Sequence, residues 1–180
     1  MRCLGQVVLV KLTQRCGSRL AWGEKIAFID SESGSASKYA DRFDFDVLEI
    51  GIKTIDIYIE AMRAAQDAGY EILIIDSMSH AWKELLEEVD KLTKAKFKGN
   101  NWSAWSEGTP KQRKFVDALL AYDGHVIATI RSKTDWLITT NDQGKNVRQR
   151  LGLAPEQGKG IEYEFDMLME LSTDHIAHVT

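Results

Sequence analysis

The sequence lacks the glycine-rich motif G-x-x-x-x-G-K-[ST] and contains few cysteines and no long apolar run. Its two cysteines, Cys3 and Cys16, match no metal-binding spacing, so free thiols in a reduced cytosolic setting are expected. No apolar run approaches the roughly 18 residues that a membrane span needs. The apolar patch within residues 1–17 is too short, and too interrupted by Lys11, for a signal peptide.

A strong excess of charge of one sign is also absent. The chain has 23 Lys and Arg against 27 Asp and Glu, which gives a formal net charge of −4. This balance excludes a global attraction to nucleic acid or to an anionic membrane, although a local basic loop remains open. At 180 residues, with 44% hydrophobic and 28% charged residues, the composition is typical of one globular domain with a sizeable core.

What is present is an alternation of apolar runs with segments of helical periodicity. Strands are expected at residues 24–30, 70–76, 125–131 and 163–171, with a further strand beginning in 175–179, and helices at 54–69, 79–99 and 109–124. A hairpin is expected over 135–153, turning around 141–145. This alternation predicts an α/β fold with a mainly parallel sheet covered on both faces.

Polar residues follow the ends of these strands, where ligands bind in such folds. The stretch EILIIDSMSHAW runs four apolar residues directly into Asp76. The polar set at this edge is Asp30, Glu32, Asp76, Ser77, Arg131 and Ser132. Plainer readings stay open, because Asp76 can cap a helix, Glu32 can be a solvated loop residue and Arg131 can simply pair with a carboxylate.

Histidine and tryptophan residues are scattered, and for them the sequence favours structural roles. Surface or structural roles are expected for His80, His125, His175 and His178. Core or helix-docking roles, rather than base stacking, are expected for Trp82, Trp102 and Trp105.

Four segments in this order resemble phage-encoded P-loop ATPases of the RecA-like class. The segments are IAFIDSESGSA, ILIIDSMSHAW, VIATIRSKTDW and GIEYEFDMLMEL, and the resemblance covers about residues 21–180. Some members of that class are linked to single-strand DNA annealing and phage recombination. The resemblance implies a RecA-like three-layer core, ATP and Mg²⁺ as cofactors, a homo-oligomer and a cytoplasmic location in a bacterial host, encoded by a phage or prophage.

The resemblance also assigns roles to individual residues. Asp76 corresponds to the Walker B carboxylate that orients Mg²⁺ through water, with Ser77 beside it in the nucleotide site. Glu32 matches the acidic residue that activates the attacking water, a task that requires a positioned proton acceptor. Arg131 and Ser132 end the strand that usually carries a phosphate-sensing residue.

The phosphate-binding loop of this class lies roughly 20 residues before the FIDSE strand end. That place holds LGQVVLVKLTQRCGSRL. Read in a shifted codon frame, this stretch permits G-P-S-G-S-G-K-T-Y-S-A-L-R-I, a complete loop running into a helix. Our hypothesis is that residues 1–20 are an out-of-frame phosphate loop, produced by mutation or by sequencing error, followed by a RecA-like core over 21–180.

As it stands, this stretch predicts weak or absent ATP binding, and the enzymatic activity is uncertain. A phosphate loop works through backbone N–H groups exposed by glycine, whereas QVVLVKLT places β-branched residues there. The segment GQVVLVKLT is expected either to pack as a replacement strand or to be disordered. Because the sequence stops at Thr180 within an expected strand, a C-terminal truncation is also expected.

One local stretch carries the residues of a single-strand DNA contact. The candidates are Lys133, Trp136, Lys145, Arg148 and Arg150, a mixture of cations and an aromatic ring that such binding uses. A solvated hairpin is the alternative. Two functions therefore stay open: an ATP-dependent recombination or annealing factor, and a non-catalytic DNA-binding or oligomerising remnant.

Overall fold

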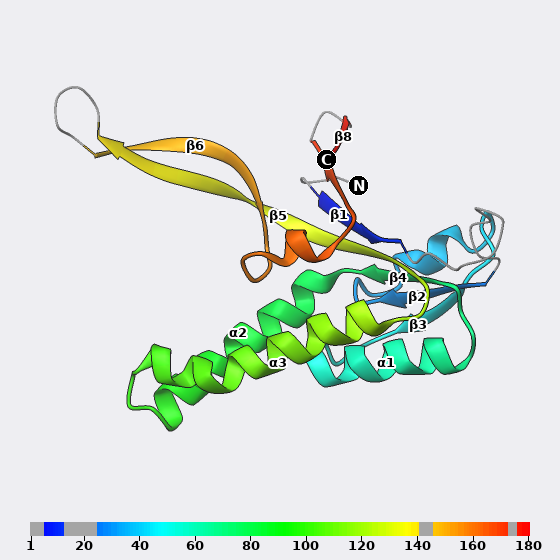
Figure 1. Ribbon diagram of the computed structural model, residues 1–180, viewed down its shortest axis with the longest axis horizontal. Helices are drawn as coiled ribbons and strands as arrows, with labels where there is room; N and C mark the ends of the chain where they lie inside the picture. The colour runs from blue at the N-terminus through cyan, green and yellow to red at the C-terminus, as the bar shows by residue number, and fades with distance from the viewer. Residues whose placement is uncertain (1–5, 13–24, 141–145, 173–175) are drawn as a thin grey trace.

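The chain forms a mixed sheet with helices against it (Figure 1). This computed structural model describes residues 6–12, 25–140, 146–172 and 176–180. Its elements are β1 (Gln6–Lys11), β2 (Ile26–Asp30), η1 (Ala36–Tyr39), β3 (Asp46–Glu49), α1 (Ile55–Asp67), β4 (Ile72–Asp76), α2 (Met78–Ala95), α3 (Asn101–Ala121), β5 (His125–Thr140), β6 (Asn146–Pro155), η2 (Ile161–Glu164), β7 (Met167–Leu171) and β8 (Ala177–Val179). None of the helices within these ranges is long and apolar enough to cross a bilayer.

The strand order is β3-β2-β4-β5-β1-β7-β8, and β6 pairs with β5 outside this path. The pairs β3–β2, β2–β4 and β4–β5 are parallel. Their apolar runs, joined by helical segments, are the pattern from which an α/β fold with a parallel core is predicted, and that fold class is confirmed. The carboxyl ends of β2 and β4 consequently lie at the same edge of the sheet.

β1 fills the position between β5 and β7, and it runs antiparallel to both. Gln6 lies opposite Arg131, and Lys11 lies opposite Val126. The expectation of a replacement strand is therefore confirmed over Gln6–Lys11, whereas its direction was not predicted. The Lys11 ammonium group anchors this end by donating to the main-chain oxygens of Leu120 at 2.5 Å and Tyr122 at 2.8 Å.

The main core lies between the helices and one face of the sheet. The buried strand residues of this core alternate along each strand, and they are Val7, Leu9, Ala27, Ile29, Leu73, Ile75, Val126, Ala128 and Ile130. They pack against α1, α2 and α3, which lie together on one side of the sheet (Figure 1). The intervening residues Phe28, Ile74 and Ile127 lie on the opposite face and are half-buried.

Helices on both faces were expected, but all three α-helices of the described residues lie on one face. The reversal of β1 gives a physical reason. Because β1 is antiparallel to β5, its last residue and the first residue of β2 lie at the same edge of the sheet. A crossover along the second face is not required between two such ends.

The third helix begins eight residues earlier than expected. α3 starts at Asn101, and the Asn100 side chain caps it by accepting from the Ser103 backbone N–H at 3.1 Å. The expected start at Thr109-Pro110 was wrong, because Pro110 lies inside the helix and only removes one backbone bond there. Gly108 lets α3 approach α2 closely, since a Cβ at this position would come within 2.6 Å of the Val89 side chain.

Two arms project beyond the sheet. The predicted hairpin is present, but its first strand is continuous with the strand expected at 125–131, so β5 runs from His125 to Thr140. Figure 1 shows the β5–β6 hairpin and the tip of the α2–α3 pair extending in the same direction from the body. A strand was expected over 163–171, but Ile161–Glu164 forms η2 and β7 begins at Met167.

Candidate functional site

The candidate site lies at the edge where β2, β4 and the middle of β5 bring polar residues together. Strand register places Asp30 beside Asp76. Thr129 follows the Ile75–Ala128 pair by one residue, which brings its side chain to Asp76. This grouping follows from parallel pairing, because parallel strands present their carboxyl ends at one edge.

Asp76 is a partly desolvated carboxylate at the end of β4. Its Oδ1 atom accepts a short hydrogen bond from the Thr129 hydroxyl. Burial raises the pKa of Asp76 above its ordinary value of 3.8, the Thr129 hydrogen bond opposes that rise, and the nearby Glu32 and Asp30 carboxylates add to it. An anionic oxygen in this position is suited to holding a hard divalent cation, which would restore the favourable charge balance.

Glu32 is bound by Arg131, which lies on β5. The Arg131 Nη2 atom donates to both carboxylate oxygens, at 2.7 and 2.6 Å, and Nε donates to Oε1 at 3.1 Å. The Arg131 backbone N–H donates to the buried Ser79 hydroxyl at 2.9 Å, which fixes this strand against the start of α2. The structure therefore joins two predicted site residues directly and neutralises the carboxylate.

Asp30 shapes the loop that carries Glu32. Its side chain is only 1% exposed, and its two oxygens accept from the backbone N–H groups of Glu32 at 2.6 Å and Ala36 at 2.9 Å. Positive φ angles at Ser33 and Gly34, 61° and 79°, close the turn between these two donors. Asp30 thus fixes the position of Glu32 without facing the open edge.

Ser31 and His80 connect the loop after β2 with the start of α2. The Ser31 hydroxyl accepts from the Ser77 backbone N–H at 2.8 Å and lies 2.7 Å from His80 Nδ1. His80 Nε2 lies 3.6 Å from the Glu32 carboxylate. Burial lowers the pKa of His80 below its ordinary value of 6.5, so this ring is neutral at pH 7. His80, expected only in a surface or structural role, lies at the site.

Ser77 supplies a polar atom with no partner. Its hydroxyl oxygen is buried and forms no hydrogen bond, although its carbonyl accepts from the Tyr58 hydroxyl at 2.8 Å. A buried hydroxyl without a hydrogen-bond partner beside Asp76 is typical of a place that binds a water molecule or a hydrated cation. Ser132, in contrast, lies opposite Pro155 at the base of the hairpin.

The residues that the structure describes fit Mg²⁺ and do not fit the phosphates of ATP. Asp76, with Thr129 and Ser77 beside it, would hold Mg²⁺ through water; among the described residues no group of three His, Cys, Asp or Glu side chains could hold a metal unaided. A phosphate loop must follow the carboxyl end of its strand at this edge. β1 points the other way, so its carboxyl end, Lys11, lies at the opposite edge of the sheet.

Four of the five predicted DNA-binding residues, Lys133, Trp136, Arg148 and Arg150, lie on the hairpin arm. Trp136 pairs with Arg150 and Ile138 with Arg148, so these four positions share one face of the two-stranded ribbon. Lys133 pairs with Ala154 and, by alternation along β5, belongs to the other face. Lys145 and His175 are outside the described residues.

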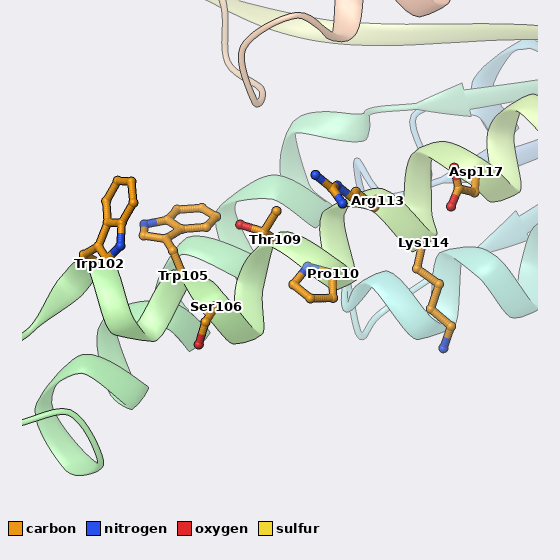
Figure 2. Close-up of a pocket in the computed structure, with 8 residues that line it drawn as sticks. All are labelled: Trp102, Trp105, Ser106, Thr109, Pro110, Arg113, Lys114 and Asp117. Carbon is orange, nitrogen blue, oxygen red and sulfur yellow. The ribbon is translucent and has the colours of Figure 1, made fainter.

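The tryptophans divide into two kinds. Trp82 and Trp105 pack on each other with ring centroids 5.7 Å apart, which is the helix-docking role expected for them. Trp102 is 89% exposed, so the same expectation was wrong for this residue. An open groove of about 730 Å³ runs along α3 from Trp102 to Asp117 (Figure 2) and includes none of the residues around Asp76.

Sequence reasoning placed Asp30 at this edge without its capping role, and it missed Thr129. Thr129 and Asp30 both lie on the strands that were predicted, and the period-two alternation of VIATIR places Thr129 on the same face as Arg131. That alternation was a usable signal for Thr129. The capping role of Asp30 gave no comparable signal, because only the folded turn shows that its oxygens accept from two backbone N–H groups.

Comparison with known proteins agrees with this geometry. A family model described as an AAA domain matches residues 15–179, and the match begins after β1. No curated protein and no solved structure matches the chain. The matched range covers nearly the whole sequence and includes the strand ends that carry Glu32, Asp76 and Arg131. The chain therefore belongs to the AAA-domain family of nucleotide-binding ATPases.

Proposed function

We propose that this chain retains the cation-binding and water-activating half of an ATPase site and lacks the phosphate-binding half. Asp76 would hold Mg²⁺ through water, and Glu32 would accept a proton from the attacking water in an intact relative. Mg²⁺, when bound, supplies charge neutralisation for the phosphates. In the present chain Arg131 and Glu32 satisfy each other instead.

The direction of β1 is the observation that carries this proposal. The strand occupies the position beside β5 with Gln6 at the site edge, and it offers valine and leucine residues in extended geometry. The carboxyl end of this strand lies at the other side of the sheet, where Lys11 is opposite Val126. A nest of backbone N–H groups around a triphosphate cannot form from such a strand.

The energetic consequence is large. Each charge-assisted hydrogen bond from a loop amide or a lysine to phosphate is worth about 1.5–3 kcal/mol. Losing two such bonds weakens binding by about a hundredfold or more. We therefore expect no measurable ATP hydrolysis by this chain and an ATP dissociation constant no tighter than about 1 mM.

Titration calorimetry with MgATP tests this expectation. The matched control is a repaired chain in which residues 1–20 are replaced by a first strand and the in-frame sequence G-P-S-G-S-G-K-T-Y-S-A-L-R-I. The repaired chain should bind and hydrolyse ATP, whereas the present chain should do neither. Micromolar binding by the unrepaired chain would contradict the proposal, because another segment would then have to hold the phosphates.

We also propose that a change of reading frame produced residues 1–20. The absence of the phosphate-loop motif at the expected place supports this origin, and the family match leaves out residues 1–14 of this segment. Sequencing the coding DNA with its upstream bases tests it. A base at any junction that forbids the glycines or the lysine of the shifted reading would refute it.

For the intact family protein, we propose a role in phage recombination or single-strand annealing, with the β5–β6 arm as the DNA contact. The shared face of Trp136, Arg148 and Arg150 supports this role, because it combines an aromatic ring with two cations. In the present chain, the corresponding activity is non-catalytic DNA binding. Oligomer formation is the alternative, and light scattering distinguishes a monomer from a multimer.

Anisotropy of a fluorescent thymidine oligonucleotide at several salt concentrations tests the DNA contact. Each neutralised arginine should reduce the slope of log K against log salt by about 0.7. Arg148→Gln together with Arg150→Gln should therefore lower this slope by about 1.4 and weaken binding. Arg63→Gln, an exposed position on α1, is the matched control and should change neither quantity. An unchanged slope in the double variant would remove the hairpin from the DNA site.

A further inference from the structure

The groove along α3 is formed by side chains that recur every three to four residues on the helix surface. Trp102, Trp105, Thr109 and Arg113 follow this spacing and line the groove. Its volume is about 730 Å³, and it is open to solvent along the helix. The helix thus presents a continuous surface from its first turn to its centre.

Aromatic rings form one end of this groove. Trp102 is 89% exposed, an unusual state for the largest apolar side chain. Trp105 is half-buried and supported from behind by Trp82, whose ring centroid lies 5.7 Å away. A supported ring beside a fully accessible ring gives two π faces on which flat groups can stack, at little ordering cost for Trp105.

A cation lies along the groove from these rings. The Arg113 side chain is exposed, and the described residues give it no ion-pair partner. Two of the neighbouring acids are already neutralised, because Lys96 pairs with Glu107 at 2.5 Å and Lys111 pairs with Glu88. From Trp105 to Arg113 the helix rises about 12 Å. Asp117 lies one turn after Arg113, and its carboxylate would repel an anion at that end of the groove. The part of the groove that can bind an anion therefore ends at Arg113.

This surface lies on the side of α3 from which the hairpin arm projects. Figure 2 shows the rings of Trp102 and Trp105 and the Arg113 side chain on the same side of the helix, whereas Lys114 points to the other side. The chain returning from β6 packs on α3, since a Cβ at Gly158 would collide with the Gln112 side chain. The two arms therefore diverge from a common base (Figure 1).

We propose that the groove formed by Trp102, Trp105 and Arg113 binds single-stranded nucleic acid, with bases on the indole rings and a phosphate at the guanidinium group. Arg113, for which the described residues give no ion-pair partner, lies with one exposed and one half-buried indole ring. Such a surface is complementary to a flexible polyanion with unstacked bases, and sequence-tolerant single-strand binding uses this pair of contacts. This inference rests on the proposed DNA function of the hairpin and adds a second contact for the same strand on the helical arm.

The test uses the chain as it exists, with the same oligonucleotide anisotropy measured across a range of salt concentrations. Trp102→Ala should weaken binding by about fivefold to a hundredfold without changing the salt slope, because stacking releases no counterions. Arg113→Gln should weaken binding and lower the slope by about 0.7. Both positions are exposed, so circular dichroism should show unchanged folding.

Matched controls separate this contact from general effects. Tyr163→Ala removes an aromatic ring that is 86% exposed but lies on η2, outside the groove, and Arg63→Gln removes a cation on α1. Neither should change affinity or slope. If Trp102→Ala and Arg113→Gln behave like these controls while the hairpin variant loses binding, the groove is excluded and the hairpin function stands.

Two other outcomes also have a clear meaning. If the unmodified chain binds no oligonucleotide at low salt, the DNA function itself fails, and the groove proposal fails with it. If Trp102→Ala changes the mass measured by light scattering and leaves DNA affinity unchanged, the groove is a contact between copies of the chain, which overturns the nucleic-acid assignment.

Discussion

Arg131 holds Glu32 through three donor contacts, two from Nη2 to the two carboxylate oxygens and one from Nε to Oε1. The carboxylate expected to activate water is therefore paired with the cation expected to sense phosphate. A phosphate that drew Arg131 away would leave Glu32 as an uncompensated, three-quarters buried base, with the neutral His80 ring as its neighbour. The two predicted roles are coupled through this one pair.

The Glu32–Arg131 pair should contribute little to stability. The side chains are 25% and 49% exposed, and ion pairs of this kind contribute about 0.5–1 kcal/mol at most. A double-mutant cycle with Glu32→Gln and Arg131→Gln, measured by urea unfolding, should therefore give a coupling energy in this range. A coupling above about 2 kcal/mol would show a pair that holds the fold together, and it would contradict a mainly functional role.

Asp76→Asn should stabilise the protein at pH 7. Because burial raises the pKa of Asp76 in the folded chain, the unfolded chain ionises first as the pH rises through the ordinary value of 3.8. As the pH rises further, the free energy of unfolding falls until the pH passes the raised pKa of folded Asp76, and it stays lower at higher pH. The advantage of the asparagine variant in urea unfolding should therefore vanish below pH 3.8. A less stable variant at pH 7 would contradict the desolvation argument.

Asp30→Ala should be among the most destabilising substitutions at the strand ends. It removes the acceptor for the N–H groups of Glu32 and Ala36, at a cost of about 2–4 kcal/mol for the two donors. Asp30→Asn keeps one acceptor oxygen and should cost less. Urea unfolding gives both values, and amide exchange should be faster at Glu32 and Ala36 in the alanine variant. Equal stability of all three proteins would rule out this role for Asp30.

A disulfide should form across β1 and β5 in the observed register. Val10 lies opposite Ile127, and directly opposed residues in antiparallel strands are about 4.5–5.5 Å apart, within the reach of a disulfide. With Cys3 and Cys16 replaced by serine, Val10→Cys with Ile127→Cys should cross-link on mild oxidation, as read by mass spectrometry.

The control for this cross-link is Val8→Cys with Ile127→Cys, a diagonal pair about 7–8 Å apart. It should stay reduced under the same conditions, because Val8 lies opposite Thr129. If the diagonal pair closed faster than the opposed pair, the observed register of β1 against β5 would be wrong.

In the repaired chain, substitutions of Asp76 and Glu32 should affect different steps. Asp76→Ala should reduce Mg²⁺-dependent ATP hydrolysis strongly, because it removes the cation's anionic anchor. Glu32→Gln should leave nucleotide binding intact and slow hydrolysis, since the amide keeps the shape but cannot accept a proton. Calorimetry and phosphate release measure the two steps separately. If binding and hydrolysis fall together in Glu32→Gln, Glu32 is structural.

The parallel core was predictable from sequence because its signals are local. Near-continuous apolar runs at 70–76 and 125–131 identify buried strands, and Gly69 ends the helix between 54 and 69 where α1 stops. Parallel strands place their polar ends at one edge. The proximity of Glu32, Asp76 and Arg131 is therefore predictable from the sequence, whereas the pairing of Glu32 with Arg131 is not.

Other features depend on information that residue patterns do not contain. An apolar run such as QVVLVK has the same periodicity in either direction, so the reversal of β1 could not be read from it. The Thr109-Pro110 dipeptide is a typical helix start, and only the Asn100 cap and the contact of α3 with α2 extend the helix through it. The exposure of Trp102 likewise depends on which side of α3 packs against α2.

The reversed β1 separates two requirements that are usually met by the same segment. The position between β5 and β7 can be filled by any short apolar strand whose amide and carbonyl groups hydrogen-bond to both neighbours. A strand running in either direction can form such bonds. Catalysis asks in addition that the segment point toward the reacting edge. A chain that meets only the first requirement can complete the sheet and still lack the segment that catalysis requires.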